Sequence, residues 1–374
     1  MILGIDTSTY LEELEHGAIY RCNGLSIDPL DAFSANGVNW MRIRIWNDPK
    51  SAEGTPYLAG NCDLDNYIRL AKLAKQKGYQ LLMDLHYSDF WADPGKQCIP
   101  KAWRDLDADG LCQAVYTFTK HCLTEAIWED VAPQMVQVGN EITNGILWPI
   151  GKLEAADGQR GNYDTFCRLI DAGCRACREI IPDAKIVLHL ERSNDKAVYQ
   201  EFFTEMEKAG IDYDIIGASY YPYWHGTPEE LFENLELCRH FGKQLMIMEL
   251  GYGFTVQPYV LDGEPRRLVI DADRAYIPGF TEIYPVTPEG QAAFLRDFLR
   301  TAQAHHIDGV FYWEPLWLPG DGICWASPAG QDYIGESGKS TANEWANQCL
   351  FDYDGQMLPS FSIFSISLES NNTI

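Results

Sequence analysis

Eight short segments of the chain are rich in apolar, β-branched and aromatic residues, and each has a length typical of a β-strand. Several are nearly continuous apolar runs, as expected for strands that are covered on both faces. Between them lie longer stretches in which apolar residues recur every three to four positions, the pattern of amphipathic helices. The predicted strands are residues 2–6, 38–46, 79–87, 135–141, 185–191, 213–221, 243–250 and 309–315.

Two of the intervening stretches carry recognisable helix boundaries. Leu64, Ile68 and Ala71 share one face of a predicted helix that ends at Gly78, a residue type that commonly terminates helices. Thr287 is followed by a proline and an acidic residue, which predicts a helix that starts with a threonine N-cap. The pattern is therefore a regular alternation of strand and helix.

Eight strands alternating with helices predict an α/β fold of the (β/α)₈ TIM-barrel type. We expect a single catalytic barrel domain over residues 1–374. The alternative is an open doubly wound sheet, which would be expected to carry a glycine-rich fingerprint after an early strand. The sequence has no such fingerprint, so the barrel is favoured.

Composition narrows the range of partners. The net charge is −25, which disfavours binding to nucleic acid, to anionic substrates and to anionic membranes. Aromatic residues make up 13% of the chain, a fraction that suits either a large aromatic core or a binding site for ring-shaped ligands. No apolar run is long enough to span a bilayer. We therefore expect a neutral ligand, no nucleic acid and no membrane, and a monomeric protein.

The cysteines bear on the compartment. There are 11 of them, an odd and scattered number that is more typical of reduced thiols than of a disulfide framework. Cys167, Cys174 and Cys177 are close together, but no second pair completes a zinc site, so they are interpreted as structural. The start of the chain lacks a signal-like segment. These features favour a cytoplasmic protein; the alternative is a secreted protein whose signal has been removed.

Candidate chemistry lies at the predicted carboxyl ends of the strands, where TIM barrels carry their active sites. Glu141 follows Asn140 at the end of the fourth strand, and Glu249 lies at the end of the seventh. We expect these strands to face each other across the barrel. Two carboxylates about 5–5.5 Å apart suit a retaining glycoside hydrolase, one as acid/base and the other as nucleophile.

Other interpretations of these carboxylates are open. A glutamate at a strand end could instead form a salt bridge with Arg42 or Arg44. Glu191 and Glu314 are rival acids, of which Glu314, beside Trp313, is interpreted as structural.

A metal site is a further alternative. His86, Asp89 and His189 offer the ligand types of metal-dependent barrel hydrolases. Those enzymes usually carry His-x-His on the first strand, whereas this strand reads Gly4-Ile5-Asp6. We therefore expect no catalytic metal.

Several long motifs resemble glycoside hydrolase family 53, the arabinogalactan endo-β-1,4-galactanases of the retaining (β/α)₈ clan. The resemblance runs nearly from end to end. It is carried by ANGVNWMRIRIWNDP (35–49), HYSDFWADPGKQCIPKAW (86–103), VGNEITNGILWPIG (138–151), SYYPYW (219–224), TPEGQAAF (287–294), GVFYWEPLW (309–317) and FDYDGQMLPSFSIF (351–364).

The resemblance implies a role for each matching residue. Glu141 would be the acid/base and Glu249 the nucleophile, kept ionised by Arg42. Asn140 would bond the sugar 2-hydroxyl, and Tyr221 would hold the nucleophile through its hydroxyl. The remaining implied substrate-binding residues are Trp313, as the floor of the reacting subsite, and His86, Asp89, Trp91 and His189 along the groove.

The sequence also departs from the family pattern. Leu250 follows the nucleophile where the family has threonine, and Glu191 stands where the family has aspartate. Residues 257–280 do not match the loop that binds calcium in some bacterial members, although Asp271 and Asp273 could still contribute ligands. We therefore expect no cofactor.

The resemblance implies hydrolysis of β-1,4-galactan, type I arabinogalactan or galacto-oligosaccharides. Two alternatives remain: a non-catalytic galactan-binding protein on the same scaffold, and a barrel glycosidase that cleaves another β-1,4-glycan.

Overall fold

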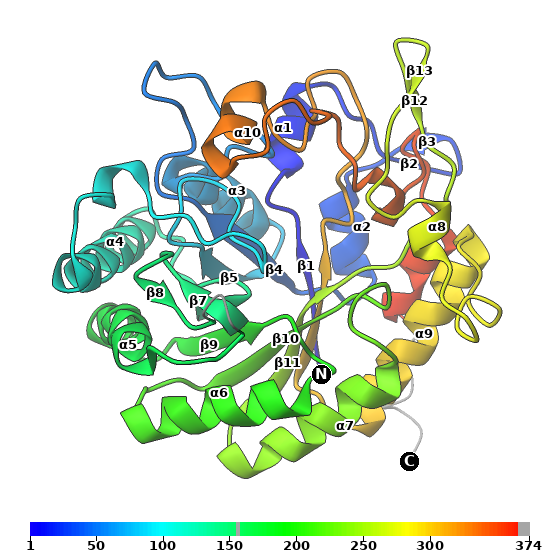
Figure 1. The fold of residues 1–374 in the computed structure, drawn as a ribbon. Helices are drawn as coiled ribbons and strands as arrows, with labels where there is room; N and C mark the ends of the chain where they lie inside the picture. The colour runs from blue at the N-terminus through cyan, green and yellow to red at the C-terminus, as the bar shows by residue number, and fades with distance from the viewer. Residues whose placement is uncertain (155–157, 366–374) are drawn as a thin grey trace.

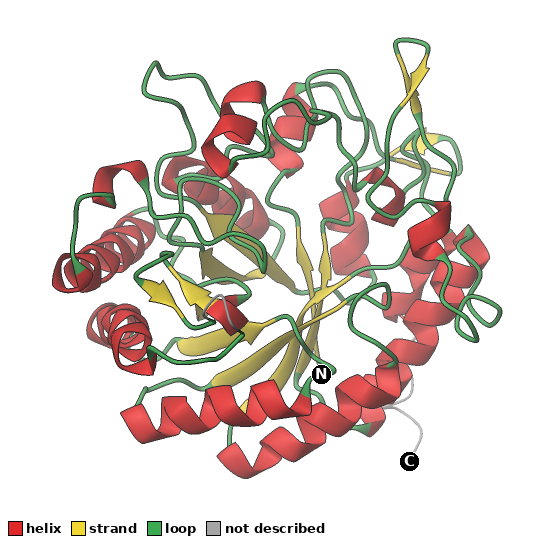
Figure 2. Cartoon of the chain, in the orientation of Figure 1, coloured by secondary structure: helices red, strands yellow, loops and turns green. Residues whose placement is uncertain are grey.

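Eight parallel strands close into a barrel at the centre of the molecule (Figures 1 and 2). The computed structural model describes residues 1–154 and 158–365. Each strand pairs with the next along the chain, and the last pairs with the first. In order round the ring the strands are β1 (Ile2–Asp6), β4 (Trp40–Ile45), β5 (Gln80–Leu85), β6 (Met135–Val138), β9 (Lys185–Leu190), β10 (Ile215–Tyr220), β11 (Gln244–Leu250) and β14 (Gly309–Trp313).

Helices surround this barrel on the outside (Figure 2). The helices are α1 (Tyr10–Glu15), α2 (Pro29–Ala35), α3 (Leu64–Gln76), α4 (Ala108–Trp128), α5 (Tyr163–Ile180), α6 (Lys196–Ala209), α7 (Pro228–Cys238), α8 (Ala272–Ala275), α9 (Pro288–Ala304) and α10 (Pro328–Ile334). Short 3-10 turns are η1 (Lys101–Trp103), η2 (Ile142–Asn144), η3 (Arg239–Phe241), η4 (Ala346–Gln348) and η5 (Pro359–Ser362). Three two-stranded ribbons lie in the connections: β2 (Arg21–Cys22) with β3 (Leu25–Ser26), β7 (Gly145–Ile146) with β8 (Gly151–Lys152), and β12 (Val260–Leu261) with β13 (Glu264–Pro265).

The predicted (β/α)₈ fold and all eight predicted strands are confirmed. The predicted strand 135–141 ends earlier, at Val138, because Gly139 and Glu141 both adopt positive φ and turn the chain. The single-domain extent of 1–374 stays a prediction, and its last nine residues lie outside the described part of the chain.

Helix boundaries were easier to predict than the buried face. Thr287 caps α9 as predicted, and its side chain accepts a hydrogen bond from the Gly290 amide. The three residues predicted to share a face of α3 all contact the core: Ala71 is fully buried, whereas Leu64 and Ile68 are partly buried at its edge. The fully buried residues of α3 that contact the core are Tyr67, Leu70, Ala71 and Ala74.

Side-chain alternation divides the strands into an outer and an inner face. The outward residues join the large core between barrel and helices, for example Met41, Ile43 and Ile45 of β4. The inward residues near the strand starts form a separate apolar plug, made by Trp40, Leu82, Met135, Val187, Ile215, Met246, Met248 and Phe311. Two positions further along four of these strands the inward residue is polar: Arg42, Asp84, Gln137 and His189. The interior of the barrel is therefore apolar near the strand starts and polar near the carboxyl ends of the strands.

One strand breaks this alternation. Ala218 of β10 pairs with Ile247 of β11, but the next residue, Ser219, pairs with Glu249, so Met248 is an extra residue in β11. Such a bulge lets two consecutive side chains point to the same side of a sheet. Met248 belongs to the apolar plug, and Glu249 also points into the barrel. Without the bulge, Glu249 would face the helices.

The cysteines are all free thiols, and the cluster on α5 is buried against the core, as its structural interpretation predicted. No helix within the described residues has the length and apolar character needed to cross a membrane.

Packing inside the barrel makes a prediction about stability. Gly4 of β1 lies against the ring of Phe311, and a Cβ at Gly4 would come within 2.3 Å of that ring. Overpacking of this kind costs about 1–3 kcal/mol, so we expect Gly4→Ala to lower Tm by roughly 1–4 °C for a chain of this length. Gly161→Ala is the matched control, because a Cβ there meets nothing within 4 Å. Equal thermal unfolding curves for the two variants would contradict this account of the plug.

Candidate active site

A cavity of about 510 Å³ opens at the carboxyl ends of the barrel strands. It receives seven of the ten residues predicted for the site: His86, Trp91, Asn140, Glu141, Tyr221, Glu249 and Trp313. The cavity is also lined by Arg44, Ala92, Asp93, Pro94, Glu191, Arg192, Trp224, His225, Val269, Trp325 and Trp345. The polar half of the barrel thus forms its floor, and loop aromatics form its walls.

Glu249 is held by two donors on the cavity floor. Its Oε1 lies 3.0 Å from Nη1 of Arg42, and its Oε2 accepts a hydrogen bond of 2.8 Å from the Tyr221 hydroxyl. Burial raises the pKa of Glu249, whereas the Arg42 charge and the Tyr221 hydroxyl oppose that rise. The two contacts favour the anionic form of Glu249, while burial still leaves its pKa raised to about 7.

Glu141 has no comparable cationic partner. It adopts a left-handed conformation with φ of 48°, and its Oε1 lies 2.6 Å from the Ser219 hydroxyl oxygen. Burial raises its pKa well above the ordinary value, and the neighbouring Glu249 and Glu191 raise it further. A non-glycine residue in this backbone region costs of order 1–3 kcal/mol, and such strain is typically found at functional sites.

The two carboxyl groups are close together. Oxygens of Glu141 and Glu249 lie within 4.8 Å of one another. Retaining glycoside hydrolases hold their carboxyl groups about 5–5.5 Å apart, whereas inverting enzymes leave about 6.5–9.5 Å for a water molecule. The prediction that their strands face each other across the barrel is wrong, because β6 and β11 are three positions apart round the ring of eight and not half a ring apart. The side chains converge because one follows a turn and the other follows a bulge.

Arg42 lies beneath the cavity rather than in its wall. Its guanidinium contacts Asp6 Oδ2 at 2.8 Å and Asp84 Oδ2 at 2.8 Å, besides Glu249. It also donates to Asn140 Oδ1 at 2.8 Å and to Gln137 Oε1 at 3.2 Å. Since only 1% of this side chain is exposed, its orientation is fixed before any ligand arrives.

Two residues predicted to line the groove do not line this cavity. Asp89 accepts hydrogen bonds from the backbone and the ammonium group of Lys101, and so fixes a connecting loop. His189 is fully buried under the floor, between Asn140 and Ser219. The family motif identified both positions, but it could not distinguish a residue in the wall from one that supports the wall.

His189 also bears on the metal alternative. Glu141, His189 and Glu249 are the only group of potential metal-ligand side chains that converges within the described residues. Both ring nitrogens of His189 are already engaged, Nδ1 with Asn140 Oδ1 at 3.0 Å and Nε2 with Ser219 Oγ at 2.8 Å. A neutral imidazole in this position has no free nitrogen for an ion.

Aromatic rings make most of the remaining wall. Trp91 stacks on Trp325 with ring centroids 4.5 Å apart, and Trp313 meets Trp345 edge to face at 4.9 Å. The Arg44 guanidinium carbon lies 4.5 Å from the Trp91 ring centroid. Stacked rings and a cation–π contact hold flat faces in place, and such faces suit the apolar side of a sugar ring.

The two other candidate carboxylates, Glu314 and Glu191, differ in whether they line the cavity. Glu314 is fully buried, accepts from Arg44 Nη1 at 2.6 Å and from Thr9, and does not line the cavity. Its structural interpretation agrees with these contacts. Glu191 does line the cavity, beside Arg192.

Sequence reasoning missed some residues of the site. Ser219, which contacts Glu141, is two positions before Tyr221 on the inward face of β10, so strand alternation could have identified it. Trp325 and Trp345 come from the long connection after β14. Nothing in the spacing of that connection indicates that its tryptophans return to the cavity.

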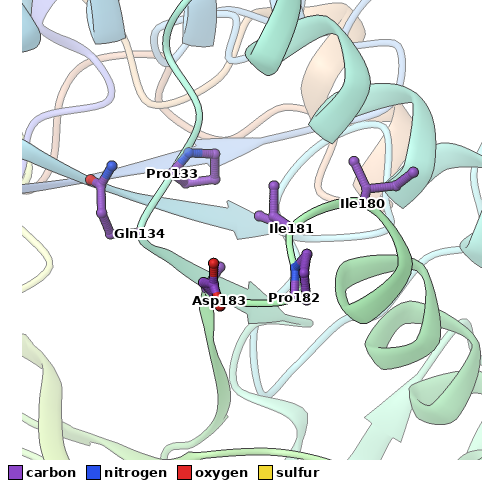
Figure 3. Close-up of a pocket in the computed structure, with 7 residues that line it drawn as sticks. Pro133, Gln134, Ile180, Ile181, Pro182 and Asp183 are labelled. Carbon is purple, nitrogen blue, oxygen red and sulfur yellow. The ribbon is translucent and has the colours of Figure 1, made fainter.

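The opposite end of the barrel has a different hollow (Figure 3). It lies between the segments that precede β6 and β9, and Asp183 is its one charged lining residue. A single exposed acid among prolines and isoleucines offers no pair of groups for acid–base chemistry. This hollow is therefore no second candidate for the active site.

Comparisons with known proteins agree with this geometry. The family model described as glycosyl hydrolase family 53 matches residues 2–364. An endo-beta-1,4-galactanase of Bacillus subtilis (strain 168) is 34% identical over 97% of this chain and 85% of its own length.

Two solved structures extend the comparison. The GH53 catalytic domain of Ignisphaera aggregans superposes with a TM-score of 0.86 at 35% identity, covering 98% of this chain and 96% of that chain. A fungal β-1,4-galactanase gives 0.76 at 28% identity, covering 97% and 98%. On its motifs, its barrel and its paired carboxylates, the chain belongs to glycosyl hydrolase family 53.

Proposed function

We propose that this chain is an endo-acting β-1,4-galactanase that retains the configuration of the anomeric carbon. The observation that carries the proposal is the asymmetric pair of carboxylates: Glu249 is bonded to a buried arginine, and Glu141, within 4.8 Å, is not. The substrate is β-1,4-galactan, type I arabinogalactan or their oligosaccharides. A neutral polymer suits a protein with a net charge of −25.

In the first step, Glu249 attacks the anomeric carbon while Glu141 protonates the departing glycosidic oxygen. Arg42 and Tyr221 favour the anionic form of Glu249, and burial favours the protonated form of Glu141. The bond between sugar and leaving group breaks, and an ester bond to Glu249 forms. Asn140 uses one amide hydrogen for the Ala92 carbonyl, so its second hydrogen is available for the sugar 2-hydroxyl.

In the second step, a water molecule attacks the anomeric carbon and Glu141 removes its proton. Esterification neutralises Glu249, which removes a negative charge close to Glu141. The pKa of Glu141 therefore falls when a base is needed, and it rises again when Glu249 is released as an anion.

The aromatic walls support the choice of a carbohydrate. Trp313 lines the cavity, and Trp91 and Trp345 flank it. These faces exclude water from the reacting bond and stack on sugar rings. We further propose that one catalytic barrel suffices, as a monomer and without a cofactor, because all these groups come from one chain.

Removal of either carboxylate is the first test. We expect Glu141→Gln and Glu249→Gln each to lower kcat/KM on unbranched galactan by at least 10²–10⁴-fold, the range typical of lost acid–base groups. Glu233→Gln, an exposed glutamate on α7, is the matched control. Binding of galactan without turnover by the wild type would favour a non-catalytic protein, and faster cleavage of another β-1,4-glycan would reassign the substrate.

Azide distinguishes the two roles. With an aryl β-galactoside whose phenol leaves without a proton, azide should attack the ester intermediate of Glu141→Ala and yield a β-galactosyl azide. In Glu249→Ala it should enter the space of the missing nucleophile and yield the α-anomer. NMR of the products reads the configuration directly, and the reverse pattern would exchange the two assignments.

The pH profile tests the hydrogen bond from Tyr221. The Tyr221 hydroxyl lowers the pKa of Glu249, so Tyr221→Phe should raise it. Since Glu249 must be deprotonated to react, the acid limb of kcat/KM should move to higher pH. Tyr220→Phe is the control, because the Tyr220 hydroxyl donates to the Gly226 carbonyl instead. A shift in the control as large as that in the variant would refute a specific effect.

Chelation tests the absence of a required ion. Asp271 already accepts from the Arg274 amide as the cap of α8, so it is engaged in the fold. We expect dialysis against EDTA to leave both Tm and galactan hydrolysis unchanged. A loss that calcium alone restores would contradict this expectation.

A further inference from the structure

Ser219 bridges the acid/base to a buried histidine. Its hydroxyl oxygen lies 2.6 Å from Oε1 of Glu141 and 2.8 Å from Nε2 of His189. Both Ser219 and His189 are fully buried. A serine hydroxyl has a single hydrogen, so it can donate to only one of these two neighbours. Which neighbour receives that hydrogen depends on the tautomer of His189.

The surrounding amides determine that tautomer. Asn140 Oδ1 accepts from Arg42 Nη2, a group that can only donate, while Nδ2 of Asn140 donates to the Ala92 carbonyl. The orientation of the amide is therefore fixed, with its oxygen 3.0 Å from His189 Nδ1. Two acceptors cannot bond each other, so Nδ1 of His189 carries the proton.

Gln137 is the other neighbour of that nitrogen, at 3.2 Å. Its Oε1 accepts from Arg42, and its Nε2 donates to Asp84 Oδ1 at 2.6 Å and lies 3.1 Å from the Gly139 carbonyl. Both amide hydrogens thus have oxygen acceptors. Gln137 therefore does not require an unprotonated Nδ1, and the assignment stands.

Neutral His189 with a proton on Nδ1 leaves Nε2 bare. Burial and the Arg42 charge hold the pKa of His189 well below its ordinary value, so the ring is neutral. Nε2 then accepts the hydrogen of Ser219. The short contact between Ser219 and Glu141 is left without a hydrogen unless Glu141 supplies one.

Resting on the proposed function, we propose that His189 and Ser219 are positioning residues that keep the acid/base proton on Glu141 in the free enzyme. The chain of donors runs from Glu141 to Ser219, then to His189, then to Asn140. Every member is satisfied only when Glu141 is protonated. Ionised Glu141 can receive the Ser219 hydrogen only if His189 loses it.

The same hydroxyl serves the second half of the reaction. Once Glu249 is esterified and Glu141 has given up its proton, Ser219 rotates and donates to the Glu141 carboxylate. The Nε2 of His189 then loses its bond until the carboxyl group is protonated again. His189 thus opposes ionisation of Glu141 without touching the substrate.

Other charged or titratable groups also act on Glu141, and they come from several elements. They are Asp93 from the loop after β5, Glu191 after β9, Tyr199 from α6, Tyr221 after β10, and Glu249 from β11. Arg42 contacts Glu249, and His225 lines the same cavity. The experiment must therefore separate the effect of His189 on the pKa of Glu141 from the effects of these other groups.

The tautomer can be measured directly in the wild-type protein. Nitrogen–proton correlation spectra of the ¹⁵N-labelled histidine side chains, with His189 assigned by its loss in His189→Leu, should show a neutral ring protonated at Nδ1. A proton on Nε2 would overturn the proposal. This reading needs no substrate, so it stands even if galactan is not hydrolysed and the proposed function fails.

The pH profile supplies the second test. In His189→Leu the Ser219 hydrogen is free to stabilise ionised Glu141, so the alkaline limb of kcat/KM should move to lower pH by about one unit, the scale of one charge-assisted hydrogen bond. His189→Gln, whose amide oxygen can accept from Ser219, should restore the wild-type limb. A limb that stays in place or moves to higher pH in His189→Leu would refute the proposal.

A double variant tests whether His189 acts on the pKa of Glu141 through Ser219. In a Ser219→Ala background there is no hydroxyl hydrogen to redirect, so adding His189→Leu should leave the alkaline limb where Ser219→Ala puts it. A further shift of about one unit would mean that His189 acts on Glu141 by another path. Near-ultraviolet circular dichroism of each variant checks that the barrel is intact.

Discussion

The arrangement of side chains at the carboxyl ends of the barrel strands depends on one buried guanidinium group. Arg42 is 1% exposed, and it contacts the carboxylates of Asp6, Asp84 and Glu249. A buried charge lowers the stability of the fold unless it is paired with an opposite charge. Without Arg42, the three buried carboxylates would destabilise the fold even more. Burial alone would lower the pKa of Arg42, but the carboxylates of Asp84, Glu249 and Asp6 raise it above its ordinary value, so the group stays cationic.

This constraint explains why the two carboxyl groups that we propose as catalytic differ. They are buried to a similar degree, but Arg42 contacts Glu249 and does not contact Glu141. The same guanidinium orients Asn140, which sets the tautomer of His189 and so the partner of Ser219. The apolar plug beneath keeps this network away from water on its other side. A polar network in a dry setting holds its geometry before substrate binds.

The fold and the position of the chemistry were predictable because both depend on local pattern. Strand periodicity gave the barrel, and long motifs identified Glu141 and Glu249. Whether a motif residue enters the cavity or supports it depends on packing between strands, which is why the motif alone did not show that Asp89 bonds Lys101 and that His189 is buried. Ser219 is small and chemically ordinary, and Trp345 lies on a long connection. Their roles arise only when distant segments meet.

The bulge at Met248 has a consequence for anyone who would copy this protein. The extra residue makes β11 less regular than its neighbours, and it is what turns Glu249 inward. A sequence optimised for a regular barrel would delete or straighten that residue and would make a better strand. The resulting molecule could keep every side chain of the proposed site in its sequence and still present Glu249, the proposed nucleophile, to the helices. In this scaffold, reactivity is encoded in a defect of register, and a designer must copy the defect as well as the residues.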